Sequence, residues 1–262
     1  MKTIKEISSS KGGKKIVMLT AYEYITAAML EKAGADIILV GDSLGMVFCG
    51  YENTLPVTVD DIIYHAKAVR RGAKNTFITA DMPFMSYQAS KLQALKNSGR
   101  IIKESGADAV KLEGGAEISG TVRALTAAGI PVMGHIGMQP QSVKSYGGYP
   151  VRASSPQGAD KLVKDAVALE KAGVFAIVIE KTPAKAAEAA AKAVKVPVIG
   201  IGAGRGCDGQ VLVTQDMLGL FEGFTPKFVK KYCGLNAAAL KGTAAFIKDV
   251  RAGKFPSKKH SF

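Results

Sequence analysis

Six ionisable residues end or follow short apolar segments of the sequence, each segment having the length of a β-strand. They are Asp42, Asp81, Lys111, Glu113, His135 and Glu180. Asp42, Asp81 and Glu113 offer only oxygen ligands, which Mg²⁺ prefers, whereas zinc would need more nitrogen or sulfur. The sequence therefore predicts a magnesium site, provided that the fold brings these side chains together.

The other three residues suit proton transfer and charge stabilisation. Glu180 could accept a proton from a carbon acid beside a metal-activated carbonyl. Lys111 and His135 could stabilise a developing oxyanion or a substrate carboxylate. Each residue also has an ordinary structural explanation: a carboxylate after a strand often caps a helix, Lys111 could extend into solvent, and His135 could be a hydrogen-bonded core residue. The collective pattern favours chemistry.

A repeated unit would position these residues: a helical stretch, a turn of small residues and a short apolar strand. The glycine in the turn is typical of a helix C-terminus that turns left-handed. We expect strands near residues 16–20, 37–42, 76–81, 108–113, 131–135, 175–180, 196–201 and 210–214. We expect helices over residues 23–33, 58–71, 89–104, 117–128, 158–171 and 184–193.

Such alternation is typical of a parallel sheet buried on both faces. About eight units in about 250 residues match the size of an α/β protein with a (β/α)₈ TIM barrel, whose strand ends meet at one rim. A doubly wound sheet stays open as an alternative, because periodicity does not report closure. With no linker in the sequence, we expect one catalytic domain over residues 1–262, with a basic tail from about residue 253.

Composition excludes several other classes of protein. The 262 residues are 47% apolar, too apolar for a disordered chain, and three scattered cysteines make no disulfide scaffold. The net charge of +13 is spread along the chain, which favours a solvated basic surface over a nucleic-acid site. No apolar run approaches the roughly 20 residues of a membrane span. We therefore expect a cytoplasmic protein that binds neither nucleic acid nor membrane.

Two further segments have more than one interpretation. The glycine-rich segment 200–204 could present N–H groups to a phosphate, or could allow close packing of a helix on a strand. It lacks the last glycine of the dinucleotide motif, so NAD binding is not predicted. Cys207 has no matched base in the sequence around it, so a thiol nucleophile is not expected.

The sequence resembles the ketopantoate hydroxymethyltransferase (3-methyl-2-oxobutanoate hydroxymethyltransferase) family over nearly its whole length. The segments that carry the resemblance lie in the same order and spacing. They are Met18–Tyr22, Val40–Met46, Thr54–Thr58, Ala80–Phe84, Val110–Gly115, Gly134–Gly137, Pro140–Ser142, Gly200–Gly204 and Asp208–Gln210.

The resemblance implies a barrel enzyme that transfers a hydroxymethyl group from 5,10-methylenetetrahydrofolate to 3-methyl-2-oxobutanoate. The products would be 2-dehydropantoate, a precursor in pantothenate biosynthesis, and tetrahydrofolate, with a Mg²⁺-stabilised enolate between. It further implies a homo-oligomer, a decamer in the best-known members.

By motif, the resemblance also assigns roles to residues. Asp42 and Asp81 correspond to Mg²⁺ ligands, and Glu113 to a third acidic residue that acts through water. The residues that correspond to contacts with the keto acid are Asp42, Ser43, Asp81 and Lys111. Glu180 matches the proton acceptor and His135 a histidine of the site.

The chain departs from the family pattern at Glu23, at Lys181 and in the segment 149–153, where folate contacts and loop geometry are affected. Two alternatives remain. One is another Mg²⁺-enolate barrel of the phosphoenolpyruvate mutase and isocitrate lyase kind, although the sequence shows no catalytic cysteine loop. The other is a basic nucleic-acid-binding or scaffold protein, which the retained acidic residues disfavour.

Overall fold

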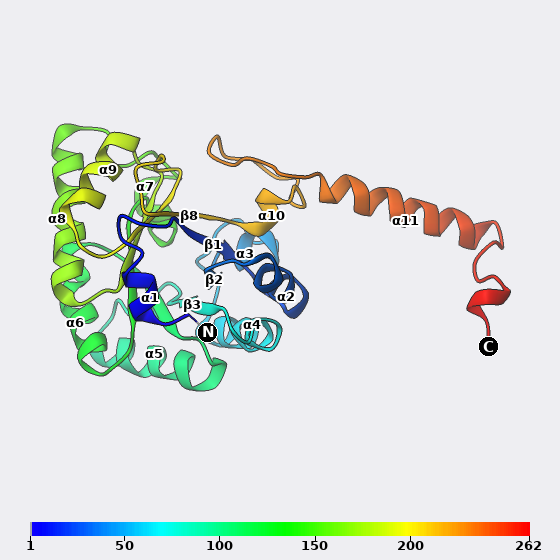
Figure 1. Ribbon diagram of the computed structural model, residues 1–262, viewed down its shortest axis with the longest axis horizontal. Helices are drawn as coiled ribbons and strands as arrows, with labels where there is room; N and C mark the ends of the chain where they lie inside the picture. The colour runs from blue at the N-terminus through cyan, green and yellow to red at the C-terminus, as the bar shows by residue number, and fades with distance from the viewer. Residues whose placement is uncertain (1) are drawn as a thin grey trace. The chain divides into compact units, whose positions relative to one another are not determined.

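The computed structural model describes residues 2–262, and its strands form one closed barrel (Figure 1). Eight parallel strands are hydrogen-bonded in chain order, and the last pairs with the first. Their bounds are β1 (Ile16–Thr20), β2 (Ile37–Val40), β3 (Phe77–Asp81), β4 (Ala109–Glu113), β5 (Val132–Gly137), β6 (Ala176–Glu180), β7 (Val198–Ile201) and β8 (Gly209–Leu212). The predicted (β/α)₈ barrel is confirmed, and closure excludes the doubly wound sheet.

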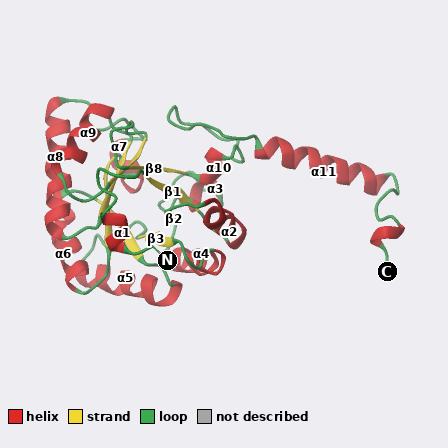
Figure 2. Cartoon of the chain, in the orientation of Figure 1, coloured by secondary structure: helices red, strands yellow, loops and turns green. Residues whose placement is uncertain are grey.

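Long helices surround the strands, as the red and yellow ribbons of Figure 2 show. They are α2 (Tyr24–Ala33), α4 (Val59–Gly72), α5 (Lys91–Ser105), α6 (Ser119–Ala127), α8 (Pro156–Ala172) and α9 (Ala184–Ala193). All six lie where the sequence predicted helices. The 3₁₀ turn η1 (Ala116–Ile118) falls at the start of the helix predicted over 117–128. The other short helices were not predicted: α1 (Ile4–Ser8), α3 (Leu44–Val47), α7 (Val143–Tyr146), α10 (Thr214–Met217) and the 3₁₀ turn η2 (Pro140–Ser142).

Local signals in the sequence set the ends of these helices. Thr58 accepts the N–H of Asp61 and the Asp61 carboxylate accepts the N–H of Thr58, a capping box that begins α4. Gly34, Gly106 and Gly173 end α2, α5 and α8 with φ of 88°, 75° and 98°. These left-handed conformations cost glycine little, so the chain can turn back into the next strand.

Two apolar layers follow from the alternation of side chains along each strand. One set of buried residues, including Ile37, Phe77, Ala109 and Met133, fills the interior of the barrel. The other set packs between the strands and the helices. Residues two and four positions after Ala109 share its inward direction, so Lys111 and Glu113 also face the barrel interior.

Residues 214–262 form a second compact unit by contact pattern. It contains α10, α11 (Leu235–Arg251) and η3 (Lys258–His260). The sequence did not predict α11, a helix with no buried residue. That residues 1–262 act as one domain with a basic tail from about 253 stays a prediction. Within residues 2–262, no helix combines the length and apolarity needed to span a membrane.

Gly72 allows α4 to contact the start of α2 closely. A Cβ at this position would lie 2.3 Å from the backbone oxygen of Tyr24 and 3.0 Å from the Cβ of Ala27. We predict that Gly72→Ala lowers the free energy of unfolding by about 1–3 kcal/mol, because backbone must shift to make room. Urea denaturation measures this change.

Gly99→Ala is the matched control, because Gly99 lies inside α5 and a Cβ there would meet nothing within 4 Å. It should leave stability unchanged or raise it by about 0.5–1 kcal/mol, as alanine favours helix. Equal effects of the two substitutions would contradict the close contact at Gly72.

Candidate active site

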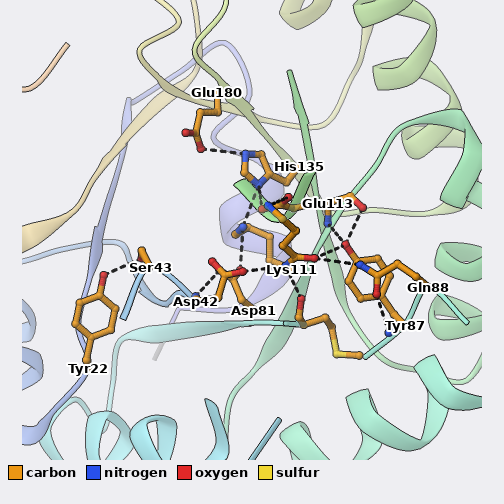
Figure 3. Close-up of polar contacts among 12 residues, drawn as sticks. Tyr22, Asp42, Ser43, Asp81, Tyr87, Gln88, Lys111, Glu113, His135 and Glu180 are labelled. Carbon is orange, nitrogen blue, oxygen red and sulfur yellow. Dashed lines mark hydrogen bonds and ion pairs between the residues drawn. The ribbon is translucent and has the colours of Figure 1, made fainter. Parts of the chain in front are cut away.

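The barrel places the predicted site residues at the carboxyl ends of β2 to β6 (Figure 3). Residues on neighbouring strands are paired in register: Asp81 with Lys111, and Glu113 with His135. Glu180 is the last residue of β6. Five strands thus bring to one rim the six side chains that the sequence singled out: Asp42, Asp81, Lys111, Glu113, His135 and Glu180.

Asp42 and Ser43 follow β2 in a tight turn. The backbone N–H of Asp42 donates to Asp81 Oδ2 at 2.9 Å, which ties the turn to β3. A Cβ at Gly41 would lie 2.8 Å from Ser43 Oγ and 3.3 Å from Asp81 Oδ2, so only glycine leaves this approach open. Ser43 Oγ lies 2.8 Å from the hydroxyl of Tyr22. The turn is therefore fixed from both sides.

Lys111 is buried at the centre of the group. Its Nζ lies 2.9 Å from Asp81 Oδ1 and 3.1 Å from His135 Nδ1, and its side chain is 5% exposed. Burial alone would lower the pKa of Lys111, but the charges of Asp81, Glu113 and Asp42 outweigh it and raise that pKa. Lys111 is therefore a buried ammonium, and the interpretation that it extends into solvent is wrong.

His135 connects Lys111 to Glu180. Burial and the charge of Lys111 would lower the pKa of His135, but Glu113 and Glu180, which face its two ring nitrogens, outweigh them and raise that pKa. Nε2 lies 3.3 Å from Glu180 Oε2, and Nδ1 lies 3.5 Å from Glu113 Oε1. The Glu180 side chain is 18% exposed, against 4% for Glu113, so Glu180 meets solvent at the mouth.

Gln141 and Tyr87 join this site, and the sequence gave no chemical reason to choose either. Gln141 Nε2 donates to Asp42 Oδ2 at 2.9 Å, and the Gln141 backbone N–H donates to Glu113 Oε2 at 3.0 Å. The Tyr87 hydroxyl donates to Gln141 Oε1 at 2.9 Å. Pro140–Ser142 was recognised as part of a family motif, whereas nothing in the sequence marked Tyr87.

The charges of the buried groups do not cancel. Asp42, Asp81 and Glu113 supply three carboxylates, and Lys111 supplies one ammonium. Burial raises the pKa of Asp42 well above its usual range, and the neighbouring charges of Asp81 and Glu113 raise it further. A divalent cation would supply the missing positive charge, so the donor set fits Mg²⁺.

The spacing of the donors limits how such an ion could be held. Within residues 2–262, no three side chains of His, Cys, Asp or Glu are arranged to hold a metal by themselves. Mg²⁺ commonly keeps several waters and takes one or two carboxylates plus oxygens of the substrate. Asp42 and Asp81 could provide the direct ligands, with Glu113 reaching the ion through water.

The segment 149–153, where the sequence departs from the family pattern, lies beside this rim. Burial raises the pKa of the half-buried Tyr149, and the charges of Asp42, Glu180 and Glu113 add to the shift. Lys181 has a φ of 46°, and its Nζ contacts the backbone oxygen of Tyr149. The contact between Lys181 and Tyr149 thus links the segment to the end of β6.

The other two segments with open interpretations have structural roles here. Cys207 is fully buried, and burial raises the pKa of its thiol to about 11, which agrees with the expectation that it is no nucleophile. A Cβ at Gly200 would lie 3.0 Å from Cys207 Sγ, and one at Gly204 would lie 2.4 Å from the Cβ of Ala184. Close packing therefore explains these glycines.

Known proteins are similar to this chain over nearly its whole length. The family model described as ketopantoate hydroxymethyltransferase matches residues 1–258. This chain belongs to that family. The 3-methyl-2-oxobutanoate hydroxymethyltransferase of Clostridium novyi is 54% identical over 254 residues, which cover 97% of this chain and 92% of the relative. The enzyme of the same name from Enterococcus faecalis is 52% identical, with coverage of 99% and 94%.

Solved structures with more distant sequences share the fold. A phosphonopyruvate hydrolase complexed with oxalate and Mg²⁺ is similar with a TM-score of 0.62 at 15% identity, over 99% of this chain and 93% of that one. A 2,3-dimethylmalate lyase of the phosphoenolpyruvate mutase and isocitrate lyase superfamily gives 0.61 at 14%, over 100% and 92%. At such identities the likeness shows the fold alone.

Gln141 provides a test of the network that orients the carboxylates. Gln141→Leu removes the donor to Asp42 Oδ2 and to the backbone oxygen of Met82, leaving buried acceptors without partners. We predict a loss of about 1–3 kcal/mol in the free energy of unfolding, measured by urea denaturation. Gln157→Leu, on the exposed first turn of α8, is the control and should change stability by less than about 0.5 kcal/mol.

A Gln141→Leu protein as stable as the control would mean that these hydrogen bonds contribute nothing net, contrary to the role described above.

Proposed function

We propose that this protein transfers a hydroxymethyl group from 5,10-methylenetetrahydrofolate to 3-methyl-2-oxobutanoate, giving 2-dehydropantoate and tetrahydrofolate in pantothenate biosynthesis. The names of relatives more than 50% identical over nearly the full chain support the acceptor and the reaction. The observation that carries the proposal is the placement of Glu180, a partly exposed carboxylate beside a buried group of opposite charges at one barrel rim.

The keto acid would bind with its oxygens toward the buried charges. Lys111 supplies a fixed positive charge for the substrate carboxylate or for the oxyanion that develops from the keto group. Ser43, held 2.8 Å from the Tyr22 hydroxyl, offers a further hydrogen bond, and Asp42 and Asp81 complete the contacts expected for the family. These groups fix the substrate with C3 facing Glu180.

Asp42 and Asp81 would hold Mg²⁺, with Glu113 acting through water. When bound, the ion would draw electron density from the keto oxygen and so acidify the hydrogen at C3. Gln141 supports this arrangement, because it donates to both Asp42 and Glu113 and thereby orients their oxygens.

Glu180 takes the proton from C3, and the electron pair of the broken C–H bond spreads onto the keto oxygen as an enolate. His135 Nε2 lies 3.3 Å from Glu180 Oε2, close enough to position the carboxylate for this step. C3 then forms a carbon–carbon bond with the methylene carbon of the donor, while the bond from that carbon to a folate nitrogen breaks. Water then gives its hydroxyl to the same carbon as the bond to the second folate nitrogen breaks. The proton that Glu180 took from C3 and the remaining proton of the water go to the two nitrogens, which gives tetrahydrofolate.

Three further expectations from the sequence accompany this proposal as predictions. They are a homo-oligomer, specifically a decamer, a cytoplasmic location, and the absence of nucleic-acid or membrane partners.

Glu180→Gln tests the assignment of the base. The protein is incubated with 3-methyl-2-oxobutanoate and Mg²⁺ in D₂O without folate, and the C3 proton signal is followed by NMR. Wild type should exchange this proton, and the variant should exchange it at least about 100-fold more slowly, since general base catalysis contributes about 10²–10⁴. Both proteins should bind the keto acid alike.

Glu188→Gln, on the exposed face of α9, is the control and should exchange at the wild-type rate. Near-normal exchange by Glu180→Gln would assign the base elsewhere. Wild type that leaves C3–H intact but cleaves isocitrate would overturn the proposed function in favour of the lyase alternative.

A further inference from the structure

A cavity of about 260 Å³ opens beside the candidate site, outside the group of buried charges. The end of β5, the short helix α7 and the first half of α8 surround it. Its lining includes Gly137, Gln139, Tyr146 and Arg152. Binding sites for whole ligands commonly occupy about 300–1,000 Å³, so this cavity suits one part of a larger molecule.

The cavity begins directly next to the proposed base. Gly137 is paired in register with Glu180, and a Cβ at Gly137 would lie 2.5 Å from the Glu180 backbone oxygen. The backbone N–H of Arg152 donates to the backbone oxygen of Lys181 at 2.9 Å. A molecule reacting at the mouth beside Glu180 could therefore extend into this cavity.

Among the charged residues that line the cavity, some already have a hydrogen-bond or ion-pair partner and one has no carboxylate partner. Lys161 forms an ion pair with Asp165 at 2.6 Å, and Glu117 accepts the backbone N–H of Gly115 at 2.8 Å. Arg152 differs, because no carboxylate within residues 2–262 lies at ion-pair distance from its guanidinium. The cavity therefore contains a cation available to an anion from outside.

The Arg152 guanidinium also lies over an aromatic ring. Its central carbon lies 4.3 Å from the centroid of the Tyr146 ring, and the Tyr146 hydroxyl donates to Gln139 Oε1 at 3.1 Å. A stacked guanidinium keeps its N–H groups free at the edge, in the geometry that binds a carboxylate with two hydrogen bonds. The stacked pair also offers an aromatic ligand a surface to pack on.

We propose that this cavity binds the aminobenzoyl-glutamate part of the folate donor, with Arg152 pairing with a glutamate carboxylate. The inference rests on the proposed function. That function requires the one-carbon group of the donor to reach the barrel mouth beside Glu180, while the anionic aromatic part of the donor lies outside the mouth.

Binding of 4-aminobenzoyl-L-glutamate, which lacks the pterin and the one-carbon unit, tests the proposal by calorimetry. Wild type should bind the probe, and Arg152→Gln should raise its Kd at least about 10-fold, with Arg152→Lys between the two. Lys164→Gln removes the same charge from the exposed side of α8 and should leave the Kd unchanged. Thermal unfolding of each variant confirms that it is folded.

Three results would overturn the proposal: no binding of the probe, an equal Kd for wild type and Arg152→Gln, or displacement of the probe by equimolar inorganic phosphate, which would indicate a simple anion site. Uncharged 4-aminobenzamide should bind more weakly than the probe, and equal binding would count against the carboxylate contact.

Proton exchange at C3 of the keto acid needs no donor, so it separates this proposal from the proposed function. Exchange without binding of the probe would overturn the cavity assignment alone. Binding that depends on Arg152, in a protein that does not exchange the C3 proton, would support the cavity as a site for aromatic carboxylates and remove its link to this reaction.

Discussion

The arrangement at the rim depends on an imbalance of buried charge. Three carboxylates lie within a low-dielectric barrel mouth with one ammonium, Lys111, among them. Burying charge without compensation is costly, and here the cost appears as a raised pKa at Asp42. A divalent cation bound among the carboxylates would remove this energetic cost, because it would supply the missing positive charge. The imbalance therefore accounts for the predicted ion and for the hydrogen bonds from Gln141 that hold two of the carboxylates in place.

Lys111 has two effects that its position explains together. Its ammonium partly compensates Asp81, and it also contacts His135 Nδ1 at 3.1 Å. The other ring nitrogen of His135, Nε2, lies 3.3 Å from Glu180 Oε2. A change at Lys111 would therefore alter both the electrostatics of the substrate site and the orientation of the base, since the residues act as one network rather than as independent groups.

The sequence was sufficient for the barrel, because alternating strands and helices with glycine at the turns are local signals. It also identified the residues at strand ends, since parallel strands in a closed barrel deliver those ends to one rim. It could not identify Tyr87, whose contact with Gln141 joins residues 54 positions apart through the fold. Short helices such as α3 and α7 were missed because a single turn carries almost no periodic pattern. The exposed helix α11 was missed as well.

The family resemblance assigned Asp42 and Asp81 as direct metal ligands and Glu113 as a residue that acts through water. Geometry alone would not have distinguished these two roles. Asp42 and Glu113 differ little in burial, yet one lies on a turn and the other on a strand. What geometry adds is the partner of each group. It shows that Asp81 neutralises the buried Lys111. Removing the Asp81 carboxylate would therefore leave Lys111 as an unpaired buried charge, and it would also remove a metal ligand.

A titration with Mn²⁺, followed by the paramagnetic resonance signal of the free ion in the presence of 3-methyl-2-oxobutanoate, measures the central claim most directly. We predict one ion bound per chain, displaced by Mg²⁺, and at least about tenfold weaker binding in Asp81→Asn, which keeps the shape of the side chain but removes its charge. Stoichiometric binding that Asp81→Asn leaves unchanged, or no stoichiometric binding at all, would contradict a cation held by these carboxylates.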